Sequence, residues 1–287
     1  MMCPRSAQLQ RRHLTNRTTS LFAAAENGDT VTVQRLLTTA VADPDEQDER
    51  GWTPLSWAAW MGHVDIVRLL VASHKVNPDK RDYFFGRSPL SWAAARGHLS
   101  IVQILLARPR IHSDSKDIDG RSPLSWAAGQ GHVDVVMQLL AEKDVHVDSR
   151  DDEGQTPLSW AAENGHSSVV ALLLENPVID PNSRGWTPLA WAAWLGHESV
   201  VQVLLGDSRV QPDTKDYSCG WTPLSLAAQE GYCGIVQQLL AKGDAVDAHS
   251  RDVGGRTALC WAAERNHQIL INIFSDREKC HPTNQNL

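Results

Sequence analysis

The chain has 287 residues, 42% of them hydrophobic, and a formal net charge of −7. Its first 20 residues hold four arginines and no acidic residue, so the remaining residues carry −11 (−7 − 4). An acidic surface repels a phosphate backbone, and no apolar run is long enough to cross a bilayer. We therefore expect neither nucleic acid nor a membrane as a direct partner.

The chain begins with a basic segment, residues 1–18, which contains all four of these arginines. Pro4 and weak amphipathicity argue against an organelle transit peptide, although a targeting role stays open. We expect a disordered leader. The five cysteines are odd in number and form no Cys-x-x-Cys pair, which favours a reducing cytoplasmic or nuclear environment.

One short motif, Thr-Pro-Leu-Ser-Trp-Ala-Ala or a close variant, recurs about every 34 residues after the leader. Its copies begin at Thr53, Ser88, Ser122, Thr156, Thr187, Thr222 and Thr257. Leu21 lies 34 residues before the leucine of the first clear copy and opens a divergent copy of its own. The repeat indicates an array of eight units and argues against a globular enzyme domain.

Each unit predicts two short helices. The Thr or Ser hydroxyl can cap the first helix, and proline fits its first position. A glycine such as Gly62 tolerates the left-handed conformation that ends this helix. The second helix carries apolar pairs four residues apart, as at 66–67 and 70–71. A polar stretch ending in another glycine, such as Gly86, then predicts a projecting turn or hairpin, called a finger below.

No unit of this size can bury its apolar face alone, so stability must come from stacking of neighbouring units. We expect the array to occupy residues 19–275, with divergent first and last units as caps. Residues 276–287 are expected to form a polar C-terminal tail. The last unit has Ala258 in place of proline and Asn266 in place of glycine, which is consistent with a degenerate cap.

These motifs resemble the ankyrin repeat, because the Gly-x-Thr/Ser-Pro-Leu, Ala-Ala, Gly-His and Leu-Leu elements recur together at its offsets. The Ser-Trp variant is similar to ankyrin arrays common in fungal proteins. The resemblance implies a mostly α-helical solenoid of about eight helix-turn-helix units joined by β-hairpin or turn fingers. It also implies binding of other proteins through the fingers and inner first helices, without a cofactor.

The sequence departs from the ankyrin pattern in two places that bear on the fold. The usual histidine after Thr-Pro-Leu is serine in most copies, as at Ser56, so the hydrogen bonds of that histidine must be made differently. The sixth copy has lost residues before Gly185, which predicts a shortened finger.

The eleven tryptophans fall into two classes. Six of them stand directly before Ala-Ala and are expected to pack the stack: Trp57, Trp92, Trp126, Trp160, Trp191 and Trp261. The other five follow the finger glycine or lie late in the first helix: Trp52, Trp186 and Trp221, then Trp60 and Trp194. The resemblance places both of these offsets on the variable concave face.

Exposed tryptophan and arginine side chains are frequent binding hot spots, so aromatic and arginine residues of this face are the candidate partner-binding set. The set comprises Trp52, Trp60, Tyr83, Phe84, Phe85, Arg87, Arg121, Trp186, Trp194, Tyr217 and Trp221. The alternative is that the rings lie flat on neighbouring fingers, for instance Trp52 against Arg87 as a cation–π pair. The aromatic positions cluster in copies two and three and again in six and seven, with acidic fingers between. One extended partner with a basic middle would fit, and so would two partners.

The recurring histidines occur once per unit and are therefore too far apart to share a zinc ion, so we expect them to brace the turn between helices. No nucleophile or phosphate-loop motif is present, and no catalytic or metal-binding residue is predicted. The favoured function is a monomeric, non-catalytic protein-interaction scaffold, with a transcriptional coregulator-type adaptor as the specific hypothesis. The alternatives are a repeat fragment of a larger multidomain receptor and, remotely, an enzyme with a groove site.

Overall fold

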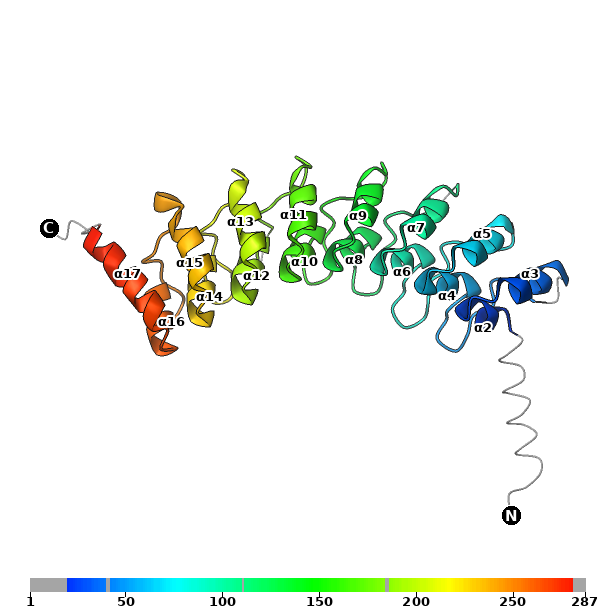
Figure 1. Ribbon diagram of the computed structural model, residues 1–287, viewed down its shortest axis with the longest axis horizontal. Helices are drawn as coiled ribbons and strands as arrows, with labels where there is room; N and C mark the ends of the chain where they lie inside the picture. The colour runs from blue at the N-terminus through cyan, green and yellow to red at the C-terminus, as the bar shows by residue number, and fades with distance from the viewer. Residues whose placement is uncertain (1–19, 40–41, 110, 184–185, 281–287) are drawn as a thin grey trace, which may run out of the picture. The chain divides into compact units, whose positions relative to one another are not determined.

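The computed structural model describes residues 20–39, 42–109, 111–183 and 186–280, and it divides into two compact units (Figure 1). The N-terminal unit comprises residues 1–146 and the C-terminal unit residues 147–287. All regular elements among the described residues are helical, and none of these helices is long and apolar enough to cross a membrane. The expected leader and Gly185 lie outside the described residues.

The described residues of the N-terminal unit form four helix pairs, each made of a first and a second helix of one repeat. They are α2 (Leu21–Glu26) and α3 (Thr30–Thr39), α4 (Pro54–Met61) and α5 (Val64–Ala72), α6 (Pro89–Ala95) and α7 (Leu99–Leu106), and α8 (Pro123–Gly129) and α9 (Val133–Leu140). The first helices pack on one another in the order α2, α4, α6, α8, and the second helices form a parallel row (Figure 1).

The C-terminal unit repeats this arrangement with four further pairs. They are α10 (Pro157–Glu163) and α11 (Ser167–Leu174), α12 (Pro188–Leu195) and α13 (Glu198–Gly206), α14 (Pro223–Glu230) and α15 (Cys233–Leu240), and α16 (Ala258–Glu264) and α17 (Gln268–Cys280). A 3₁₀ turn, η1 (Gly243–Ala245), follows α15. Each first helix packs on the next, so the predicted helical solenoid is confirmed within each unit.

Two details refine this expectation. The fingers are turns closed by one or two backbone hydrogen bonds, such as the 3.0 Å bond from the Asp117 N–H to the Arg121 carbonyl and the 3.1 Å bond from the Gly120 N–H to the Asp117 carbonyl. No strand is assigned to any finger in the described part of the chain. Helix α17 continues beyond residue 275, so residues 276–280 are helical where the polar tail was expected to begin.

The first helices begin as the sequence predicts, with a buried hydroxyl cap and proline in the first turn. In α4 the Ser56 N–H donates to the Thr53 Oγ1 over 3.0 Å, and both residues are fully buried. The Ser56 hydroxyl, which replaces the usual ankyrin histidine, lies 3.0 Å from the same Thr53 oxygen. The Ser56 hydroxyl therefore has a hydrogen-bond partner within the cap.

In five repeats a histidine makes a contact with the preceding repeat. The His98 Nε2 lies 3.1 Å from the carbonyl oxygen of Trp60, and His63, His132, His197 and His267 make the equivalent contact with a first-helix carbonyl of their preceding repeats. The ring also covers the glycine that ends that first helix. An added Cβ at Gly62 would stand 2.7 Å from the His98 Cε1. Glycine is thus required for space as well as for its positive φ.

We expect two glycines of the C-terminal unit to differ in their tolerance of alanine. Gly231 and Gly255 both have positive φ, of 85° and 77°. A Cβ at Gly231 would lie 2.7 Å from the His267 Cε1, whereas a Cβ at Gly255 meets nothing within 4 Å. Gly255→Ala should lower the free energy of unfolding by about 1 kcal/mol through backbone strain. Gly231→Ala should lower it by about 2–4 kcal/mol, because the histidine ring must also move.

Urea unfolding of both variants, followed by circular dichroism, measures this difference. Equal losses would contradict the role given to the histidine ring.

Candidate partner-binding surfaces

In five repeats an aspartate at the start of the finger turn holds the turn and a tryptophan ring together. In the fourth repeat, the Oδ1 of Asp117 accepts from the N–H groups of Asp119 and Arg121, over 3.1 and 2.9 Å. The Oδ2 accepts from the indole Nε1 of Trp126 over 2.9 Å. The same indole–carboxylate bond joins Trp57 to Asp48, Trp92 to Asp82, Trp160 to Asp151 and Trp261 to Asp252, at 2.8–3.2 Å.

The sixth and seventh repeats show what happens when one partner is missing. In the sixth repeat the shortened finger has no such aspartate: nine residues before Trp191 stands Asn182, whose side chain bonds Gln211 and Arg209 of the next repeat, and the Trp191 Nε1 has no hydrogen-bond partner among the described residues. In the seventh, Leu226 replaces the tryptophan, and Asp216 accepts from the backbone of its own turn and from the Ser218 hydroxyl. Sequence analysis assigned the tryptophans to packing but missed this bond. The regular spacing of nine or ten residues between the aspartate and the tryptophan could have revealed this bond in the sequence.

The aromatic cluster of the N-terminal unit contains Trp52, Trp57, Trp60 and Trp92. The Trp52 ring lies between Trp57 and Trp92, with centroid distances of 4.5 and 4.4 Å, and contacts Trp60 edge-on at 5.9 Å. Trp52 was expected to be exposed, but only 7% of its surface is accessible. Stacking between two rings of successive repeats removes it from solvent.

Arg87 is also buried more deeply than expected. Its guanidinium lies over the rings of Trp92 and Trp126, at 4.5 and 3.6 Å, and its Nε is 3.3 Å from the Asp117 carboxylate. Only 12% of the side chain is exposed, and this burial lowers the pKa of Arg87. These contacts take the place of the pairing with Trp52 that the alternative interpretation suggested for Arg87. Arg121 lies over Trp126 at 5.0 Å.

The solvent-facing part of this surface is therefore the finger tip and the end of α4. Tyr83, Phe84 and Phe85 are 66%, 60% and 44% exposed. The Tyr83 hydroxyl donates to the Gln47 Oε1 over 2.9 Å. Trp60 is half-buried, and the Arg96 guanidinium lies 4.4 Å from its ring centroid.

The C-terminal unit has its own aromatic cluster, formed by Trp186, Trp191, Trp194 and Trp221, and all four rings are half-buried. The Trp186 ring is central, with centroid distances of 4.7 Å to Trp191, 5.2 Å to Trp194 and 6.5 Å to Trp221. Tyr217 lies on the finger that precedes Trp221 and is 77% exposed. The structure thus brings together the predicted site residues of the sixth and seventh repeats.

A family model described as ankyrin repeats (3 copies) matches residues 3–82, 73–151, 137–216 and 209–286. The chain belongs to the ankyrin-repeat family. Ankyrin repeats are generally non-catalytic modules, and the family supports a protein-interaction scaffold.

Curated relatives match over short segments. The mouse ankyrin repeat domain-containing protein 49 is 49% identical over 51 residues, which cover 18% of this chain and 21% of that protein. Its bovine counterpart is 46% identical over 52 residues, 18% of this chain and 22% of that protein. The mouse 2-5A-dependent ribonuclease is 45% identical over 62 residues, 22% of this chain and 8% of that protein. The matched segments therefore span about a fifth or less of the length of these curated relatives.

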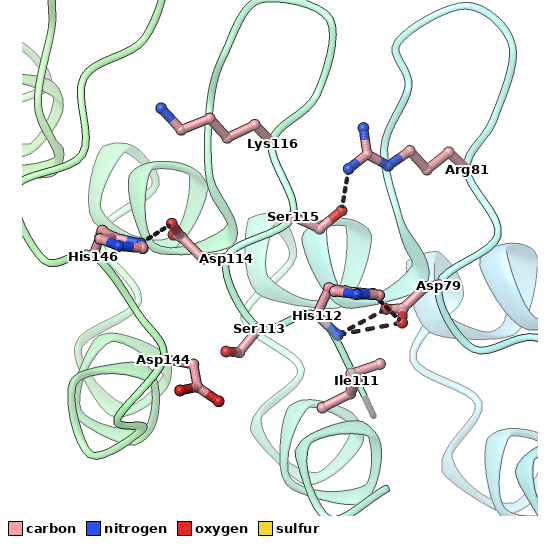
Figure 2. Close-up of a pocket in the computed structure, with 10 residues that line it drawn as sticks. All are labelled: Asp79, Arg81, Ile111, His112, Ser113, Asp114, Ser115, Lys116, Asp144 and His146. Carbon is pink, nitrogen blue, oxygen red and sulfur yellow. Dashed lines mark hydrogen bonds and ion pairs between the residues drawn. The ribbon is translucent and has the colours of Figure 1, made fainter. Parts of the chain in front are cut away.

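The N-terminal unit also carries a polar groove of about 670 Å³ between the loops that follow its second helices (Figure 2). Figure 2 shows that its two histidines are already paired: the Nδ1 of His112 is 2.9 Å from Asp79, and that of His146 is 2.8 Å from Asp114. Ser115 accepts from Arg81 over 2.8 Å. These pairs join the loops of successive ankyrin repeats. We therefore interpret the groove as part of the packing between repeats and not as a ligand site.

Aspartates of these loops form a ladder along each unit. The Asn77 N–H donates to the Asp45 Oδ2 over 2.9 Å, and the Gln211 N–H donates to Asn182 over 2.7 Å at the corresponding place. Four aspartates of this ladder have a raised pKa, because burial raises it and their hydrogen bonds cancel only part of that increase. They are Asp45, Asp114, Asp148 and Asp213. In all four, the Oδ1 is buried without a hydrogen-bond partner.

We expect ladder and finger aspartates to respond oppositely to removal of their charge. Burial raises the pKa of Asp213 above 3.8, so its ionised form opposes folding at pH 7. Asp213→Asn keeps a side-chain oxygen that can accept the backbone hydrogen bond, as Asn182 does. This variant should leave the free energy of unfolding at pH 7 unchanged or slightly higher.

Burial alone would raise the pKa of Asp252, but bonds from the Arg256 N–H and the Trp261 indole lower it below 3.8.

The stability that Asp252 supplies is therefore present above pH 3.8 and is lost as pH falls through its lower folded pKa. Asp252→Asn should lower the free energy of unfolding by about 1–3 kcal/mol at pH 7, and this deficit should close in acid. Denaturant unfolding between pH 3 and 7 measures both variants. A loss from Asp213→Asn as large as that from Asp252→Asn would refute the distinction.

Proposed function

We propose that this chain is a non-catalytic scaffold that binds partner proteins through the finger and first-helix side of each unit. The observation that carries the proposal is a set of aromatic rings left partly open to solvent on both units. In the N-terminal unit these are Trp60, Tyr83, Phe84 and Phe85. In the C-terminal unit they are Trp186, Trp194, Tyr217 and Trp221.

The arrangement favours binding because the open rings rest on rings that are already fixed. Trp60 stands edge-on against Trp92, 4.9 Å away, and the Trp92 indole is held by Asp82. A ring fixed before binding loses little conformational entropy when a partner covers it. Tryptophan, tyrosine and arginine are also the residues most often found at binding hot spots.

A non-catalytic scaffold can act on its partners only by binding them. The repeats supply binding surfaces, so we propose that the protein bridges or covers its partners as a regulatory adaptor, of transcriptional coregulator type. We further propose that it acts as a monomer inside the cell. Cys219, Cys233 and Cys260 are free thiols, which supports a reducing environment.

A second candidate is that this array forms the binding part of a larger multidomain protein. The segment matched in the mouse 2-5A-dependent ribonuclease is only 8% of that protein, so there the similar repeats belong to a much longer chain, which favours this alternative. In that case the same surfaces would recruit partners to activities located elsewhere. Transcript mapping around the coding region separates the two candidates.

Alanine substitutions at the open rings should remove partners without unfolding the array. One variant carries Trp60→Ala and Phe84→Ala, and the other carries Trp194→Ala and Trp221→Ala. Each ring at a hot spot contributes about 2–4 kcal/mol, so recovery of partners in affinity purification should fall by at least tenfold. The measurement is quantitative mass spectrometry of the captured proteins.

Matched controls replace exposed apolar residues away from the fingers. Met137 on α9 and Val178 in the loop after α11 are 50% and 73% exposed. Met137→Ala and Val178→Ala should leave the recovered partners unchanged, and circular dichroism should show all variants folded. Recovery of the same proteins by both ring variants would disprove the proposed function.

A further inference from the structure

The two aromatic clusters differ in whether the chain itself supplies a cation to the rings. In the N-terminal unit the Arg96 guanidinium lies 4.4 Å from the Trp60 ring centroid, and Arg87 lies over Trp92 at 4.5 Å. In the last repeat Arg256 lies over Trp261 at 3.7 Å. The scaffold therefore builds cation–π contacts wherever an arginine stands beside these ring positions.

The C-terminal cluster has the same ring positions without the arginines. Trp194 lies seven residues after its cap residue, as Trp60 does. In the next repeat, however, the positions that correspond to Arg87 and Arg96 are occupied by Trp221 and Glu230. Among the described residues, no arginine or lysine lies over the ring of Trp186, Trp194 or Trp221.

Carboxylates flank this cluster on both sides. Glu163 ends α10 and Glu230 ends α14, and both helices pack against α12, which carries Trp194 in its last turn. Glu163 accepts from the Gln155 amide over 2.8 Å, and Glu230 from the Gln229 amide over 3.2 Å. Neither carboxylate forms an ion pair within the described part of the chain.

The cations on the neighbouring fingers are engaged elsewhere. Lys215 donates to the Arg251 carbonyl over 2.9 Å. Arg256 pairs with Asp252 and Glu264, at 3.3 and 3.6 Å. The cluster thus combines open indole faces with two acids, and among the described residues no cation pairs with its rings.

We infer that Trp186, Trp194 and Trp221 bind an arginine or lysine side chain from a basic segment of the partner protein. The inference rests on the proposed function and names the chemistry of the partner at the C-terminal unit. The cation takes the place over an indole that Arg96 takes over Trp60, and Glu163 and Glu230 add electrostatic attraction. The N-terminal surface, whose rings are already covered by arginines, does not share this preference.

Binding of short peptides tests the inference. The probes are three ten-residue Gly-Ser peptides that carry four arginines, four glutamates or four leucines. The arginine peptide should shift the indole N–H signals of Trp186, Trp194 and Trp221 in ¹⁵N spectra of the full chain. Trp194→Leu preserves the net charge of the array and should weaken arginine-peptide binding about tenfold, which separates ring contact from general attraction to an acidic protein.

Two variants of the N-terminal unit serve as matched controls. Trp60→Leu, at the corresponding ring, should leave the affinity for the arginine peptide unchanged. Arg96→Glu reproduces the residue found at position 230 and should create a second binding site that shifts the Trp60 indole signal.

The inference is overturned if the glutamate or leucine peptide binds the C-terminal cluster as tightly as the arginine peptide. It is equally overturned if Trp194→Leu binds the arginine peptide like the parent chain. The proposed function has a separate readout, because it fails only if the paired ring variants keep all captured partners. Loss of partners by Trp194→Ala with Trp221→Ala, without arginine-peptide binding, rejects this inference alone.

Discussion

The hydrogen bond between a finger aspartate and the indole of its repeat determines how aromatic side chains are presented along this array. One carboxylate closes the finger turn through its Oδ1 and holds the ring through its Oδ2, as Asp117 does for Trp126. The turn and the first helix are therefore joined in each repeat that has both partners. Rings such as Trp52 and Trp60 then pack against indoles whose positions are already fixed. Asp216, which lacks a tryptophan, shows that the turn can still close without the ring.

Contacts between successive repeats join them into a stack within each compact unit. A histidine reaches back to a first-helix carbonyl of the preceding repeat and fills the space left by its terminal glycine, as His98 does at Gly62. Buried alanines such as Ala58 and Ala59 allow the first helices to pack closely. The scaffold is thus nearly constant, and the chemistry of each surface depends on a few variable positions. Arginine at such a position covers a ring, whereas glutamate leaves the ring open beside a negative charge.

Local sequence features predicted the fold because each has a local physical cause. The hydroxyl cap, the proline and the helix-ending glycine recur together in the six copies that begin at Thr53 to Thr222, and residues such as Thr53 and Gly62 take the predicted conformations. The exposure of site residues was harder to predict, because it depends on neighbours that are 39 or 40 residues away in the chain. Trp52 is buried by Trp92, and Arg87 by Trp126, of the following repeat. The aspartate–indole bond could have been found from its regular spacing.

Hydrogen exchange of the indole N–H groups tests the central role of the finger aspartates most directly. Trp57, Trp160 and Trp191 are all half-buried, but only the first two donate to a finger aspartate, over 3.0 and 2.8 Å. The account predicts that the Trp57 and Trp160 indoles exchange with deuterium at least about tenfold more slowly than the Trp191 indole, because a hydrogen-bonded N–H must open before it exchanges. Equal protection of all three indoles would contradict the account.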